Sequence, residues 1–241
     1  MSPAGGLGLL DVHVARKRVV NASGQTVEVL SDFAFRLEGG RIGALIGPSG
    51  CGKSSALRIL AGLDQQFEGR VMRPPGPLSM AFQEPRLLPW RTVEDNIRLA
   101  APQVGEGELK ALMNALGIAA HRKHFPGELS LGLARRVALA RAYAIKPALL
   151  LLDEPFVSLD APLALALQNH FATLVADRAV TAVLVTHDVG EAVRLADRIF
   201  VLSPRPARVI GEIKVEAPRA AMSGAEACSL AARVEAMRIP A

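Results

Sequence analysis

The sequence predicts an α/β fold with a mainly parallel sheet core, an antiparallel β layer and a helical subdomain. Two short apolar segments, 148–152 and 181–186, are separated by a helical run from Leu163 to Ala176, and such alternation is typical of a parallel sheet. A third apolar segment, 42–46, leads into a glycine-rich loop and then a helical pattern. With 241 residues the chain can bury a sizeable core, so we expect one domain over 1–241.

The remaining elements follow in chain order. Apolar residues alternate at Leu10, Val12 and Val14, and again over 27–35 after a polar turn at 21–25, which predicts two antiparallel strands. After the glycine-rich loop, Leu57, Leu60 and Leu63 recur at helical spacing. Residues from about 84 to 143 lack strong strand signals and carry helical stretches, so we expect a helical insert there. A last helix is predicted over 226–237.

Composition excludes several classes of protein. Lys and Arg exceed Asp and Glu by 28 − 23 = 5, but no block of basic residues and no interleaved aromatic residues mark a nucleic-acid groove, so we expect no nucleic-acid partner. The two cysteines, Cys51 and Cys228, are expected to be free thiols in a reducing compartment. We find neither a secretory signal pattern nor an apolar run long enough to span a bilayer.

The glycine-rich loop carries the strongest chemical signal. It satisfies the pattern G-x-x-x-x-G-K-[ST], in which backbone amides surround phosphate oxygens at a helix N-terminus. Lys53 would reach the β and γ phosphates, and the hydroxyl of Ser54 would bind Mg²⁺. The alternative, a purely structural glycine turn, is disfavoured because a strand and a helix flank the loop. The pattern predicts a P-loop NTPase that binds ATP and Mg²⁺ through Gly47, Pro48, Ser49, Gly50, Cys51, Gly52, Lys53, Ser54 and Ser55.

Two adjacent carboxylates follow the buried strand at 148–152. The carboxyl end of a parallel strand is where ligands bind in such folds, and Asp153 and Glu154 lie there. Asp153 suits a Walker B role on Mg²⁺, and Glu154 suits a general base that polarises the attacking water. Alone, such a pair would more often be a helix cap and a surface charge. Beside a phosphate loop, the catalytic interpretation is favoured.

Together these motifs resemble the nucleotide-binding domains of ABC transporters over roughly residues 9–210, with several motifs in family order. The resemblance implies that Gln83 contacts Mg²⁺ and links the site to a membrane subunit. It implies that His187 is the switch histidine, whose neutral imidazole would bind the γ phosphate and hold the water and Glu154 in line. It further implies a homodimer in which the signature residues Ser130 and Gly132 and the D-loop residue Asp160 contact ATP bound to the other copy.

The strings FQEPRLLPWRTVEDNI and THDVGEAVRLADRIFVLSPRPARV most resemble the ATPases of nitrate, sulfonate and taurine importers. This resemblance implies an ATP-hydrolysing subunit at the cytoplasmic face of the cell membrane, bound peripherally to two permease subunits and served indirectly by an extracytoplasmic solute-binding protein. The alternatives are a structural ABC subunit with little hydrolysis, a soluble ABC ATPase of DNA repair or translation, and a P-loop kinase.

The sequence departs from the family pattern at two places that affect the site. The signature reads LSLGL instead of LSGGQ, with Leu131 and Leu133 at the changed positions. The aromatic residue that stacks on adenine is missing, since no Phe, Tyr or Trp lies between residues 7 and 32. The position that this aromatic residue occupies in the family falls near Val19. Arg16 or Arg18 is the candidate to lie on the adenine instead. Cys51 is either a reactive thiol or a small spacer within the loop.

Overall fold

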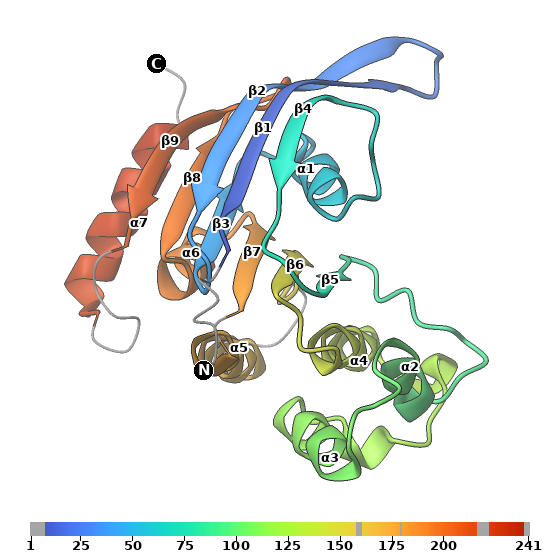
Figure 1. Ribbon diagram of the computed structural model, residues 1–241. Coiled ribbons are helices and arrows are strands. Elements are labelled where there is room, and N and C mark those ends of the chain that lie inside the picture. Colours follow the sequence, from blue (N-terminus) through green and yellow to red (C-terminus); the bar gives the residue numbers. More distant parts are fainter. Residues whose placement is uncertain (1–7, 158–160, 179, 216–221, 239–241) are drawn as a thin grey trace, which may run out of the picture.

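The computed structural model describes residues 8–157, 161–178, 180–215 and 222–238, which form two sheets with helices packed around them (Figure 1). The smaller sheet has the strand order β2-β1-β4, and both of its pairings are antiparallel. The larger sheet has the order β5-β6-β7-β3-β8-β9, and every described pairing except β8–β9 is parallel. The predicted α/β fold, with a mainly parallel core and an antiparallel layer, is confirmed.

The antiparallel layer begins with a long hairpin. β1 (Leu10–Val20) pairs with β2 (Thr26–Leu37), and β4 (Glu68–Met72) pairs with the other edge of β1. The polar turn between β1 and β2 is closed by Asn21, whose Oδ1 accepts hydrogen bonds from the amides of Ser23 and Gln25. The turn and the two strands lie where the alternating apolar residues predict them.

The larger sheet is buried on both faces. Its strands are β3 (Ile42–Ile46), β5 (Leu78–Ala81), β6 (Leu149–Asp153), β7 (Thr181–Thr186), β8 (Arg198–Leu202) and β9 (Val209–Lys214). Successive side chains of β6 enter different hydrophobic clusters, Leu149 and Leu151 on the side of β1, β2 and α1, and Leu150 and Leu152 on the side of the other helices. This alternation is the two-residue period of a strand, and it explains why every position of β6 is apolar until Asp153.

Seven α-helices lie in the described ranges: α1 (Lys53–Leu60), α2 (Val93–Ala100), α3 (Glu106–Ala115), α4 (Leu131–Ala144), α5 (Ala161–Arg178), α6 (Val189–Leu195) and α7 (Gly224–Arg238). The helices predicted over 163–176 and 226–237 correspond to α5 and α7. None of the helices in these ranges combines the length and apolarity needed to cross a membrane.

The first of these helices ends earlier than its apolar spacing predicts. α1 stops at Leu60, and Gly62 has a positive φ of 74°. The amide of Gly62 donates to the carbonyl of Ile59, and the amide of Leu63 donates to that of Arg58, which is the Schellman arrangement that closes a helix at a glycine. Leu63 therefore lies beyond the helix and is exposed, so its assignment to the helical face was wrong.

Helices α2, α3 and α4 pack together beside the β5 edge of the sheet (Figure 1). A buried carboxylate, Glu94 on α2, joins this group of helices to the segment after α3. It accepts hydrogen bonds from Arg122, Arg98 and Lys123 at 2.6 to 3.0 Å. These hydrogen bonds, above all that of Arg122, hold the pKa of Glu94 well below its usual range despite its burial. The ion pairs therefore stabilise the packing of the helices.

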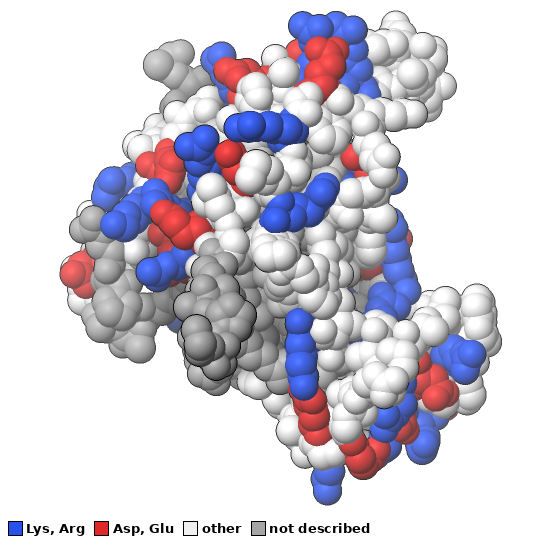
Figure 2. Space-filling model, in the orientation of Figure 1, with Lys and Arg blue, Asp and Glu red and all other residues white. Residues whose placement is uncertain are grey.

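The charged residues are distributed without large separation of sign on the face seen in Figure 2. Basic and acidic side chains alternate over the β1–β2 hairpin and over the helical part at the lower right. Several of the basic residues are paired, for example Arg16 and Arg18 with Glu28. The excess of positive charge is thus spread over the described part of this face rather than gathered in one stripe.

Candidate active site

The phosphate loop connects β3 to α1 and leaves the helix N-terminus open. The N-cap residue of α1 is Gly52, which has no side chain to cap the first amides. Gly50 and Gly52 have φ values of 74° and 134°, which only glycine adopts without strain. A Cβ on Gly52 would also lie 2.9 Å from Val29 Cγ1. Residues of β2 thus fill the space under the loop, and the free amides at the start of α1 form an anion site.

Lys53, the first residue of α1, is turned back into the loop. Its ammonium donates to the carbonyls of Gly47 at 2.7 Å and Pro48 at 2.9 Å, and the residue is 6% exposed. Within the described ranges no carboxylate forms an ion pair with this ammonium. A buried charge without such a partner is costly, whereas phosphate oxygens at this place would supply a counter-charge. The loop therefore holds a cation ready for an anionic ligand.

Asp153, at the end of β6, faces the start of α1. Burial raises its pKa, against a hydrogen bond from Ser54 and the nearby charge of Lys53, both of which lower it. A bound cation would favour the ionised form in the same way. The oxygen donors here are one carboxylate, one hydroxyl and the side-chain amide of Gln83, and Mg²⁺ is usually held by such a sparse oxygen set together with substrate phosphates. The residues present therefore fit Mg²⁺.

Glu154 is held by three neighbours, one on β7 and two in the segments that follow β5 and β7. Its backbone takes a left-handed φ of 48°, and its amide donates to the carbonyl of Val185 on β7. In the side chain, Oε2 accepts from Gln83 Nε2 at 3.1 Å, and Oε1 lies 3.3 Å from Nδ1 of His187. A carboxylate fixed in this way by an amide and an imidazole can accept a proton from a water placed beside it.

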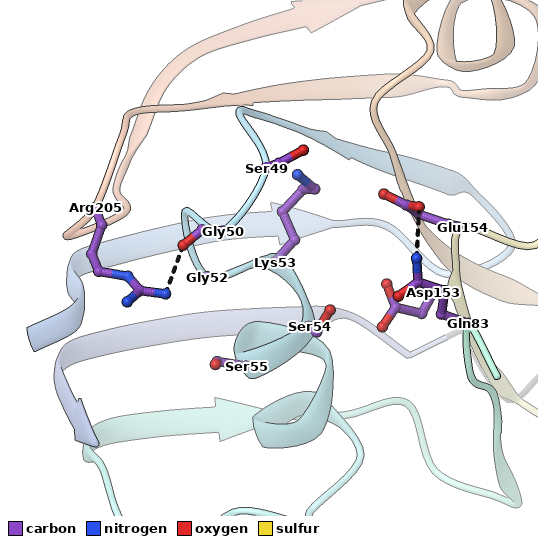
Figure 3. A pocket seen from close by; sticks show the side chains of 10 residues that line it. All are labelled: Ser49, Gly50, Gly52, Lys53, Ser54, Ser55, Gln83, Asp153, Glu154 and Arg205. Carbon is purple, nitrogen blue, oxygen red and sulfur yellow. Dashed lines mark hydrogen bonds between the residues drawn. The ribbon is translucent and has the colours of Figure 1, made fainter. Parts of the chain in front are cut away.

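The phosphate loop, Asp153, Glu154 and Gln83 surround one cavity of about 340 Å³ at the carboxyl ends of β3 and β6 (Figure 3). The side chains of Lys53 and Ser54 on one side face those of Asp153 and Glu154 on the other. The residues that line it are Ser49, Gly50, Gly52, Lys53, Ser54, Ser55, Gln83, Asp153, Glu154 and Arg205. The cavity is therefore both strongly polar and open at a helix N-terminus, as a site for phosphates requires.

Several predicted residues lie outside this lining. Cys51 is 2% exposed and packs into the core beneath the loop, which favours its interpretation as a spacer. His187 reaches Glu154 but lines a second cavity of about 550 Å³ between α5, α6 and the segments that follow β6 and β7. Ser130 is the N-cap of α4, where its Oγ accepts from the amide of Leu133, and neither it nor Gly132 lines the phosphate cavity. Asp160 lies outside the described residues.

Arg205 lines the cavity but was not predicted from the sequence. It lies in the connection from β8 to β9 and donates from Nη2 to the carbonyl of Gly50 at 2.7 Å. β8 is the neighbour of β3 in the sheet, so the residues that follow β8 emerge on the same edge as the phosphate loop. The signal that was available is an arginine between two prolines just after an apolar strand.

Comparisons with known proteins identify a family model and relatives that match this chain. The family model described as ABC transporter matches residues 30–157. The aliphatic sulfonates import ATP-binding protein SsuB 2 of Burkholderia cenocepacia is 40% identical over 220 residues, covering 88% of this chain and 80% of the relative. A protein of the same description from Pseudomonas syringae pv. tomato is 43% identical over 207 residues, covering 86% and 87% of the two chains.

The fold also matches solved structures. The dimeric structure of the bacterial ABC transporter cassette MJ0796 superposes with a TM-score of 0.76 and 26% identity, covering 88% of this chain and all of that one. A post-hydrolysis state of the same cassette, bound to ADP and phosphate, superposes with a TM-score of 0.75.

Proposed function

Because the chain belongs to the ABC transporter family, we propose that it is the ATP-hydrolysing subunit of an importer of aliphatic sulfonates or similar small organic or inorganic ions, such as nitrate and taurine. The observation that carries the ATPase assignment is the convergence of the phosphate loop, Asp153, Glu154 and Gln83 on one cavity. The names of the relatives support the class of solute. The reaction is ATP plus water to ADP plus phosphate.

The phosphate end of ATP binds where the loop amides and Lys53 meet. The ammonium of Lys53 exchanges its carbonyl partners for β and γ phosphate oxygens. Ser54, Asp153 and Gln83 would hold Mg²⁺, which when bound neutralises phosphate charge during the transfer. Because phosphoryl transfer depends mostly on positioning and electrostatics, these fixed contacts are the main contribution of the loop.

The proton of the attacking water goes to Glu154. His187 donates from Nδ1 to Oε1 of Glu154, and Gln83 donates to Oε2, so the carboxylate is oriented from both sides. The neutral form expected from the sequence cannot donate to both Glu154 and the γ phosphate, because a neutral imidazole that donates from Nδ1 keeps Nε2 as an acceptor, whereas a protonated ring donates from both nitrogens. In its protonated form His187 would hold the γ phosphate and Glu154 together.

Two copies of the chain would complete the site. Ser130 and Gly132 at the N-terminus of α4 lie away from the phosphate cavity of their own chain, and we propose that they and Asp160 contact ATP bound to the partner copy. The dimeric cassette of similar fold supports this arrangement. Two permease subunits would bind the dimer at the cytoplasmic face of the membrane, and an extracytoplasmic binding protein would deliver the solute. Within each copy we propose one nucleotide-binding domain with a helical subdomain at about 84–143.

Replacing Glu154 by glutamine tests the assignment of the base. The amide keeps the acceptor for Gln83 but cannot take a proton, so hydrolysis should fall by about 10² or more while ATP binding survives. Phosphate release and ATP binding should be measured on the wild type, on Glu154→Gln, and on Glu235→Gln as a control on the exposed side of α7. Near-normal turnover in Glu154→Gln would remove Glu154 from this role. Negligible turnover in the wild type would favour the structural subunit with little hydrolysis.

A further inference from the structure

We propose that Arg205 binds the nucleoside part of the nucleotide by laying its guanidinium plane on the base. This inference rests on the proposed function and deepens it, because it assigns the base-binding side of the cavity to a residue to which the sequence analysis gave no role. A guanidinium group is planar and stacks on aromatic faces. It would supply the flat contact that the missing aromatic residue of β1 does not.

The loop that carries Arg205 is fixed to the rest of the fold by backbone hydrogen bonds. The amide of Ala207 donates to the carbonyl of Val29 at 2.8 Å, and the amide of Ser31 donates to the carbonyl of Ala207 at 3.1 Å. Within the loop, Ser203 Oγ accepts from the amide of Arg208. Val29 on β2 also lies directly under Gly52 of the phosphate loop. The same strand therefore positions the phosphate loop and the loop of Arg205.

The side chain of Arg205 is anchored at one edge only. Its Nη2 donates to the carbonyl of Gly50, the guanidinium makes no other hydrogen bond or ring contact within the described part of the chain, and the residue is exposed. Among the described residues no carboxylate forms an ion pair with it. An arginine that is held in place without a salt bridge at the rim of a ligand cavity is available to a ligand.

The direction of the nucleotide places the base near this side chain. Figure 3 shows Arg205 on one side of the phosphate loop and Asp153, Glu154 and Gln83 on the other. The γ phosphate must lie on the side of Glu154, where the attacking water is activated. With the β and γ phosphates bound at Lys53, the ribose and base leave the loop in the opposite direction, toward Arg205.

The candidates on β1 are less suited to this role. Val19 is half-buried and packs against the hydrophobic cluster that contains Cys51 and Ala207. Arg16 and Arg18 both lie near the carboxylate of Glu28, at 3.4 and 3.7 Å. Because a guanidinium plane stacks on any base, Arg205 should bind adenine and guanine nucleotides with similar strength.

The test compares ligands that contain a nucleoside with a ligand that contains phosphate groups alone. Binding of ADP, GDP and inorganic pyrophosphate, none of which the enzyme hydrolyses in the proposed reaction, should be measured by calorimetry on the wild type and on Arg205→Ala. We expect the variant to bind ADP and GDP about tenfold more weakly, within the range of stacking contacts, and to bind pyrophosphate within about twofold of the wild type. Arg205→Tyr should recover most of the nucleotide affinity, because it restores a flat face. Arg205→Lys should not, because it keeps only the charge.

The controls distinguish the possible failures. Arg208→Ala removes the same charge from the same loop outside the cavity, and it should leave all three affinities unchanged. Lys53→Ala should abolish binding of all three ligands, and wild-type protein that binds none of them would contradict the proposed function itself. If the wild type binds but Arg205→Ala weakens pyrophosphate as much as ADP, or leaves ADP unchanged, the nucleoside contact is refuted. Failure of Arg205→Tyr to recover affinity would refute stacking.

Discussion

Glu191, in the first turn of α6, is a buried carboxyl group whose replacement by glutamine should change how stability depends on pH. The residue is 6% exposed. Its Oε2 accepts a hydrogen bond from Thr186 Oγ1 at 2.8 Å, while its Oε1 is buried without a hydrogen-bond partner in the described part of the chain. Burial, with smaller contributions from the charges of Asp188 and Glu154, raises the pKa of Glu191 to about 7, against the lowering effect of Thr186.

The direction and the size of the change in stability with pH follow from this pKa. The ordinary value is 4.5, so between about pH 4.5 and pH 7 the folded protein keeps a proton that the unfolded chain has lost. The contribution of Glu191 to stability is therefore fully present below pH 4.5 and is lost as the pH rises through 7. The linkage relation gives a loss of about 2.5 kcal/mol between pH 5 and pH 8.

Glutamine keeps an acceptor for Thr186 but carries no charge at either pH. We therefore expect the free energy of unfolding of Glu191→Gln, relative to the wild type, to be about 2.5 kcal/mol higher at pH 8 than at pH 5. The measurement is urea unfolding of both proteins at the two pH values. Glu235→Gln, an exposed change on α7, should show no such difference. A relative stability of Glu191→Gln that is equal at pH 5 and pH 8 would show that the folded site does not favour the protonated carboxyl, and the reasoning would be wrong.

Three further predictions test other parts of the structure. A mixture of a Ser130→Ala chain with a Lys53→Ala chain should regain hydrolysis that neither has alone, because one composite site per heterodimer stays intact; heterodimers without activity would argue for hydrolysis within one chain. Iodoacetamide should label the exposed Cys228 and not the buried Cys51, so folded Cys228→Ser should stay unlabelled by mass spectrometry, and rapid labelling of that variant would contradict the burial of Cys51. Glu94→Gln should lower the free energy of unfolding at pH 7 by about 2 kcal/mol, because it replaces the charged acceptor of the hydrogen bonds from Arg98 and Arg122 by a neutral amide. The loss should shrink on acidification toward the lowered pKa of Glu94, whereas Glu106→Gln, a change in a largely exposed partner of the same arginines, should cost much less.

The elements that were predictable are those whose signal is local. The phosphate loop was found because its glycines, lysine and serine lie close together in sequence, and β3, β6 and β7 because each contains a short, mainly apolar run. β4 was missed since four of its five residues are exposed, so it shows no alternation and is defined only by its pairing with β1. Gly62 is a local signal for the end of α1. The prediction nevertheless extended the helix to Leu63, because the apolar residues continue at helical spacing up to that position.

The site was only partly predictable for a related reason. Asp153 and Glu154 follow from the rule that ligands bind at the carboxyl ends of parallel strands. The approach of Gln83 and His187 to Glu154 joins residues 71 and 33 positions away, and only the resemblance to a family suggested it. Arg205 depends on backbone hydrogen bonds between Ala207 and β2, which no side-chain pattern in the sequence reveals.

The altered signature sequence can be assessed from the position of each changed residue in α4. Leu133, at the place of the usual glutamine, packs partly against the hydrophobic core, while its amide donates to Ser130 Oγ. The hydroxyl of Ser130 thus acts there as an acceptor, and its own proton is left for a phosphate oxygen. The open amides and the dipole of a 14-residue helix favour an anion at the same end. The change from LSGGQ to LSLGL therefore removes one hydrogen-bonding side chain and keeps the serine hydroxyl and the helix N-terminus. Because Ser130 and Gly132 do not line the cavity of Gln83 and Glu154, we propose that the chemical step does not depend on the lost side chain. This favours an active ATPase over a subunit that only binds nucleotide.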